Sequence, residues 1–133
     1  MPSNTLYLYG ISNCDTMKKT RRWLDEHAVH YQFHDYKKAG LPLELAQTMV
    51  AALPLETLLN KRGSTWRKLS PQEQASVEHG GTAALINTYP SVVRRPLLQH
   101  PVLGWMAGYD ESRWQALLPD SADNNTENAR TPI

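Results

Sequence analysis

The chain has 133 residues, of which 41% are hydrophobic, and this suffices for the core of one domain. Its 14 Lys and Arg residues nearly balance 13 Asp and Glu residues, so the net charge of +1 gives no overall attraction to nucleic acid. No apolar run approaches the roughly 18 residues of a spanning helix, and the N-terminus lacks the basic and apolar segments of a signal peptide. We therefore expect no nucleic-acid or membrane partner.

The single cysteine and the spacing of the histidines argue against two further classes of protein. Cys14 is the single cysteine, which argues against a secreted domain held together by disulfides. The five histidines do not show the spacing of a metal site, so we expect no bound metal. We expect a cytoplasmic monomer.

The N-terminal residues predict a strand, a helix and a second strand. Residues 5–9 form a short apolar run rich in Leu and Tyr, and residues 29–36 alternate as a strand does. Between them, residues 14–27 place apolar side chains at helical spacing. A strand–helix–strand order over about 35 residues is typical of a parallel βαβ unit. The helix side chains expected to face inward are Met17, Thr20, Leu24 and Ala28.

The middle of the chain is predicted to be mostly helical. Ser70 and Glu73 have the spacing of a capping box, and Pro71 suits the first helical position. The other expected elements are a helix at 43–53, a short helical turn at 54–60, a loop at 61–65 and a helix at 82–89.

Strand character returns near the C-terminus. Residues 97–98 and 102–106 are separated only by 99–101, so they predict a hairpin, and 111–118 predict a last helix. The tail from 120 to 133 is polar without periodicity, and we expect it to be disordered.

These elements define one expected domain over residues 1–119. Its fold class is α/β, with a mixed sheet of about four strands. A helical insertion, at about residues 40–90, separates the second strand from the third.

Cys14 is the first candidate for chemistry. It follows the first strand and opens the first helix, with Ser12 or Asn13 as the expected N-cap. The unpaired N–H groups and dipole of a helix N-terminus favour a thiolate. The alternative is a buried structural cysteine, because free cysteines are often buried. Met17 occupies the position of the second thiol in a Cys-x-x-Cys motif, so any redox cycle needs a thiol from another molecule.

Charged neighbours of Cys14 act in opposite directions. Lys18 and Lys19 add positive charge one helical turn on, although both also fit a solvated helix face. Asp15 disfavours the thiolate, because a neighbouring carboxylate repels it.

Two arginines are candidates for anion binding, because a guanidinium is a rigid donor fork for oxyanions and carboxylates. Arg95 precedes Pro96 directly before a strand, like the cis-proline loop of thioredoxin-like proteins, and we expect Arg95 to project toward the thiol. For Arg94 we prefer an ordinary surface position. Arg62 fits either a binding role or a cationic helix end that stops at Gly63.

Together these motifs resemble the arsenate reductase family, which includes Spx-type regulators, and more narrowly the bacterial YffB-like proteins. The similarity extends over residues 5–118 in family order, and it implies a thioredoxin-like fold with a helical insertion. The segments that carry it are Tyr9–Lys19, Leu58–Arg67, Arg95–Leu98 and Gly108–Glu111.

The resemblance implies a thiol-based reductase. It assigns catalysis to Cys14 and the binding of glutathione or an oxyanion to Asn13, Arg62, Arg95 and Pro96. A further arginine expected after the hairpin is missing from residues 102–106. This departure favours the YffB-like activity, a glutathione-dependent thiol reductase, over arsenate reduction. Glutathione is then a co-substrate, either alone or with a glutaredoxin, and no cofactor is bound.

The competing class is a non-enzymatic regulator of the Spx type that binds RNA polymerase. Spx-type regulators often carry Cys-x-x-Cys, which Met17 interrupts here. Exposed tryptophans would favour such a docking surface, and we expect core positions instead for Trp66, Trp105 and Trp114.

Overall fold

The computed structural model describes residues 5–118 and contains a four-stranded sheet in the order β2-β1-β3-β4. Strand β1 pairs in parallel with β2 and antiparallel with β3, and β3 pairs antiparallel with β4. The predicted fold class is therefore confirmed. The tail predicted to be disordered, 120–133, lies outside the described residues. The strands are β1 (Tyr7–Gly10), β2 (Gln32–Asp35), β3 (Leu97–His100) and β4 (Gly104–Ala107).

Helix α1 (Asp15–Glu26) joins the two parallel strands, as the βαβ pattern predicts. Its buried residues include three of the four expected ones, together with Trp23. The expectation for Ala28 is wrong, because the helix ends before it and Ala28 is exposed with a φ of 56°. A left-handed residue after the helix turns the chain toward β2.

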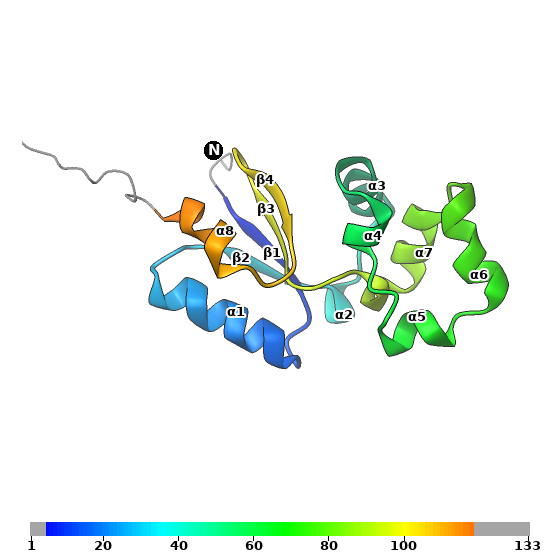
Figure 1. Cartoon of the computed structure of the whole chain (residues 1–133), viewed down its shortest axis with the longest axis horizontal. Helices are drawn as coiled ribbons and strands as arrows, with labels where there is room; N and C mark the ends of the chain where they lie inside the picture. The colour runs from blue at the N-terminus through cyan, green and yellow to red at the C-terminus, as the bar shows by residue number, and fades with distance from the viewer. Residues whose placement is uncertain (1–4, 119–133) are drawn as a thin grey trace, which may run out of the picture.

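Helices α1 and α8 (Glu111–Trp114) pack on one face of the sheet, and a short 3₁₀ helix, η4 (Gln115–Leu117), follows α8 (Figure 1). Their apolar side chains meet alternate strand residues in a cluster that we call the sheet core. Burial of this kind stabilises by about 25 cal/mol per Å² of apolar surface. The sheet core consists of Leu6, Leu8, Met17, Trp23, Leu24, Leu98, Met106 and Trp114.

The helical insertion runs from the end of β2 to residue 92, and it forms a separate lobe beside the sheet (Figure 1). The predicted loop at 61–65 is partly wrong, because a helix begins at Ser64. The predicted capping box is confirmed, with Ser70 and Glu73 bonding reciprocally. The elements are α2 (Tyr36–Ala39), α3 (Leu43–Ala52), α4 (Leu55–Leu58), α5 (Ser64–Lys68), α6 (Pro71–Ala75), η2 (Ser76–His79), α7 (Thr82–Thr88) and η3 (Pro90–Val92).

A second apolar cluster, which we call the insertion core, unites this lobe with the sheet. Helices α3 and α7 supply Met49 and Ile86, both fully buried. The sheet and its margin supply Tyr9, Tyr36 and Leu97 to the same cluster. The two lobes therefore share buried side chains.

The C-terminal hairpin is confirmed, but its turn lies further along the chain than predicted. Gln99 and His100 belong to β3, and the turn occupies 101–103. Trp66 and Trp114 are buried, as expected, whereas Trp105 is half-buried and stacks on Tyr9 with ring centroids 5.8 Å apart.

Candidate functional site

Cys14 is itself the N-cap of α1, so the prediction that Ser12 or Asn13 caps the helix is wrong. Its backbone is extended, with φ −153° and ψ 127°, and its carbonyl accepts the first helical bond from the Lys18 N–H at 2.9 Å. No side chain caps the N–H groups of the first turn, which leaves them available to an anion beside the thiol. The side chain of Cys14 is half-buried and unpaired with another cysteine.

Gly10 and Met17 fix the space under the thiol-bearing turn. Met17 is fully buried, and a Cβ at Gly10 would lie 2.4 Å from its sulfur. A larger residue at position 10 would force the buried Met17 side chain to move. The position of a second thiol is thus occupied by a core side chain.

Arg95 is the predicted binding residue that the structure brings to Cys14. Its Nη1 donates to the Tyr36 hydroxyl at 3.1 Å, to the Ser91 carbonyl at 3.2 Å and to the Val93 carbonyl at 3.3 Å. These three bonds fix one side of the guanidinium. The Arg95–Pro96 peptide bond is cis, and Pro96 is buried.

Electrostatic coupling joins Arg95, Tyr36 and Cys14. Burial lowers the pKa of Arg95, but the charge and hydrogen bond of Tyr36 and the interaction with Cys14 outweigh it and raise that pKa. Burial raises the pKa of Tyr36, and the neighbouring Arg95 offsets part of this effect. A permanently charged arginine therefore faces the thiol.

Asp35 ties the thiol-bearing turn to α2. Its carboxylate accepts from the Ser12 N–H at 3.2 Å and from the N–H groups of Lys37 and Lys38 at 3.0 and 3.3 Å. Slight burial raises the pKa of Asp35, but the bonds from Ser12 and from the two lysine amides outweigh it and hold the pKa below its ordinary value. The sequence analysis missed this residue. An Asp at the end of a strand is typical of a helix N-cap, and Gly40, five positions later, is typical of a helix end. Together they indicate a short capped helix.

The other predicted residues lie apart from this group. Asn13 is exposed, with no side-chain partner within residues 5–118. Arg62 is also exposed, and it lines a cavity of about 430 Å³ with Arg94 rather than with Arg95. The surface position expected for Arg94 is wrong. It is half-buried, and it donates to the carbonyls that end α4, those of Glu56, Thr57 and Leu59.

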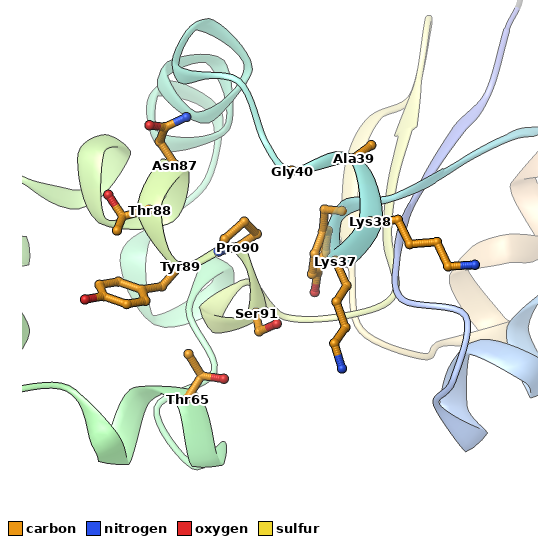
Figure 2. Close-up of a pocket in the computed structure, with 11 residues that line it drawn as sticks. Lys37, Lys38, Ala39, Gly40, Thr65, Asn87, Thr88, Tyr89, Pro90 and Ser91 are labelled. Atoms are coloured by element: carbon orange, nitrogen blue, oxygen red, sulfur yellow. The ribbon is translucent and has the colours of Figure 1, made fainter.

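A cavity of about 580 Å³ opens between α2 and the α7–η3 segment (Figure 2). Tyr36 and Ser91, both partners of Arg95, belong to its lining, so the cavity adjoins the thiol site. Sequence reasoning missed it, because it forms between segments about 50 residues apart. The remaining lining residues are Lys37, Lys38, Ala39, Gly40, Thr65, Asn87, Thr88, Tyr89 and Pro90.

The described part of the chain, residues 5–118, contains no group of three or more His, Cys, Asp or Glu side chains placed to hold a metal ion. None of its helices is long and apolar enough to span a membrane.

A half-buried thiol at a helix N-terminus, opposite an arginine next to a cis-proline, defines the class of the molecule as a thiol-bearing α/β domain. The model of the ArsC family matches residues 9–117. The chain therefore belongs to the ArsC family, and the resemblance to arsenate reductases is confirmed.

Its relatives carry different descriptions. The solved structure of a protein named YFFB has a TM-score of 0.78 at 39% identity, covering 86% of this chain and 99% of that one. An arsenate reductase (ArsC) related protein from Brucella melitensis has a TM-score of 0.66 at 40% identity, covering 84% of this chain and 92% of that one. The global transcriptional regulator Spx of Streptococcus pneumoniae is 25% identical over 116 residues, 86% of each chain.

Proposed function

We propose that the protein is a glutathione-dependent thiol–disulfide reductase that uses Cys14 as its nucleophile. The observation that carries the proposal is the pairing of this single thiol with the anchored guanidinium of Arg95 at the N-terminus of α1. Both features stabilise negative charge on sulfur. The absence of a second cysteine in the sequence requires an external thiol to complete the cycle.

The reaction has two exchange steps. The Cys14 thiolate attacks the glutathionyl sulfur of a mixed disulfide, and the Cys14 Sγ–S bond forms as the substrate S–S bond breaks. The substrate leaves as a thiolate with the electron pair and takes a proton from water. A glutathione thiolate then attacks the glutathionyl sulfur on Cys14, which releases Cys14 and forms glutathione disulfide. One mixed disulfide and one glutathione thus become a free thiol and glutathione disulfide.

Arg95 contributes by holding charge in place. Nη1 of Arg95 already donates hydrogen bonds to three groups of the protein. The other guanidinium nitrogens are therefore available to a carboxylate of the glutathionyl group or to the leaving thiolate. In this proposal the protein acts in the cytoplasm as a monomer, and a glutaredoxin can replace free glutathione in the second step.

Turnover of a glutathionylated peptide by glutathione, coupled to glutathione reductase and NADPH, tests the proposal. Wild-type protein should accelerate it, and Cys14→Ser should abolish the acceleration. Arg95→Lys should lower it about tenfold, because a charged hydrogen bond is worth about 1.5–3 kcal/mol. Arg67→Lys, at an exposed position on α5, is the matched control and should leave the rate unchanged.

Parallel measurements test two alternative functions, arsenate reduction and Spx-like regulation. Arsenate supplied in place of the peptide should not support turnover; turnover with arsenate alone would reassign the protein as an arsenate reductase. The Spx-like alternative rests on the 25% identity with that regulator. Capture of RNA polymerase subunits by Cys14→Ser and wild type alike, with no peptide turnover, would favour it.

A further inference from the structure

The cavity between α2 and the α7–η3 segment has the size and chemistry of a ligand site. Its volume of about 580 Å³ falls in the range of about 300–1,000 Å³ that small-molecule sites occupy. Polar residues from three separate segments line it: Lys37 from α2, Thr65 from α5 and Ser91 from η3. Figure 2 shows these three side chains at the same end of the cavity, with Asn87 at the opposite end.

Charge gives this cavity a preference for anions. Its lining contains Lys37 and Lys38 and no Asp or Glu. The nearby Asp35 carboxylate already accepts hydrogen bonds from three backbone N–H groups. The lysine ammonium groups and the hydroxyls of Thr65 and Ser91 have no hydrogen-bond or ion-pair partner within residues 5–118. Lys37 and the two hydroxyls are therefore free to bind a carboxylate at the cavity, whereas the Lys38 side chain extends away from it on the other side of α2 (Figure 2).

The cavity is also connected to the reactive thiol. Tyr36 and Ser91 contribute to its lining, and both bind Nη1 of Arg95, which in turn interacts with Cys14. Arg95 thus links the cavity lining to the thiol through direct contacts on both sides.

We infer that this cavity binds the carboxylates of the small anionic peptide thiol that exchanges with Cys14, and that Lys37 selects a charged disulfide over a neutral one. The inference rests on the proposed thiol exchange and adds a specificity-determining residue. Glutathione meets the requirement, because it carries two carboxylates within a tripeptide.

The experiment compares two disulfides, glutathione disulfide and the neutral bis(2-hydroxyethyl) disulfide. The rate at which each forms an adduct on Cys14 is followed by intact mass spectrometry at low salt. Lys37→Gln should slow the glutathione reaction about threefold, as expected for a partly exposed ion pair, and Lys38→Gln should slow it less, because that side chain extends away from the cavity. The rate with the neutral disulfide should not change. Lys68→Gln is the control, since Lys68 is exposed, changes the net charge equally and lines neither cavity described above.

A second measurement separates binding from chemistry. S-methylglutathione cannot exchange, so its binding to Cys14→Ser can be followed through amide chemical shifts. Shifts at Asn87 and Ser91 that disappear in Lys37→Gln would support the inference. An unchanged preference between the two disulfides in Lys37→Gln, or no shifts at these residues, would overturn it and leave the proposed reductase intact. Wild-type protein that binds S-methylglutathione in the cavity but forms no adduct would overturn the proposed function and preserve the binding site.

Discussion

The sheet lobe and the helical insertion differ in how their elements are held. The sheet lobe has one long helix, α1, packed with α8 on a regular sheet, and its fold follows from local patterns. The insertion is built largely from helices of four to ten residues, which are too short to be stable without tertiary packing. The insertion core supplies that packing by including residues of the sheet.

This difference explains where the site lies. The chain leaves the sheet at Tyr36 and returns to it at Arg95, and the side chains of these two crossing points are hydrogen-bonded to each other. Cys14 comes from the sheet lobe and faces this junction. The sheet lobe therefore provides the thiol, whereas the junction provides the charged Arg95 and the insertion provides most of the cavity lining.

The largest expected effects compare the two cores. Leu8→Ala in the sheet core and Ile86→Ala in the insertion core each remove a fully buried side chain, at a cost of about 2–5 kcal/mol. Since the insertion core contains sheet residues, both variants should unfold in one transition, measured by urea titration with far-UV circular dichroism and tryptophan fluorescence. Ile86→Val is a milder variant, at about 0.5–1.5 kcal/mol. Two separated transitions in the Ile86 variants would show that the lobes fold independently.

An intermediate effect is expected at the junction itself. Tyr36→Phe removes the hydroxyl that donates to the Val93 carbonyl at 2.7 Å and accepts from Arg95. We expect a loss of about 1–2 kcal/mol in unfolding free energy and slower alkylation of Cys14 by iodoacetamide, by about threefold. Tyr31→Phe is the control, because its hydroxyl accepts from Arg21 and takes no part in the junction. Equal alkylation rates for Tyr36→Phe and wild type would mean that Tyr36 does not hold Arg95 for the thiol.

The smallest effect concerns the tie between the thiol-bearing turn and α2. Asp35→Ala should cost about 1 kcal/mol, typical of a lost N-cap, and Asp35→Asn should restore most of it, because Asn also caps helices well. The folded-state pKa of Asp35 lies below its ordinary value of 3.8, so this contribution is present above that value and is lost as pH falls through the folded-state pKa. Stability curves against pH should therefore converge for wild type and Asp35→Ala only under acidic conditions. Asp25→Ala, on the exposed side of α1, should give no such convergence.

The sequence predicts the sheet lobe better than the junction. The βαβ unit, the hairpin and the Ser70 capping box follow from local periodicity and capping chemistry, and each is found close to its expected position. The placement of Cys14 at the start of α1 follows from the same patterns. By contrast, the boundary errors at Ala28 and Ser64 arise where a single turn residue or tertiary packing decides the backbone.

Parts of the site depend on contacts that local patterns do not encode. The bonds from Arg95 to Tyr36 and from Ser12 to Asp35 join residues 59 and 23 positions apart. Arg94 and Arg95 are adjacent in sequence yet bind on different sides, the former at the end of α4 and the latter beside the thiol. The position before Pro96 and the resemblance to a known family single out Arg95, whereas no local pattern predicts that Arg94 binds the end of α4.

The most direct test of the account is the intact mass of the wild-type protein after exposure to glutathione disulfide and then to reduced glutathione. The account predicts a single glutathionyl adduct, located on Cys14 by peptide mapping, that disappears when reduced glutathione is added. Cys14→Ser should gain no mass at either stage. A wild-type protein that acquires no adduct at neutral pH, or one whose adduct persists in excess glutathione, would contradict the central claim that Cys14 is a reactive thiol resolved by an external one.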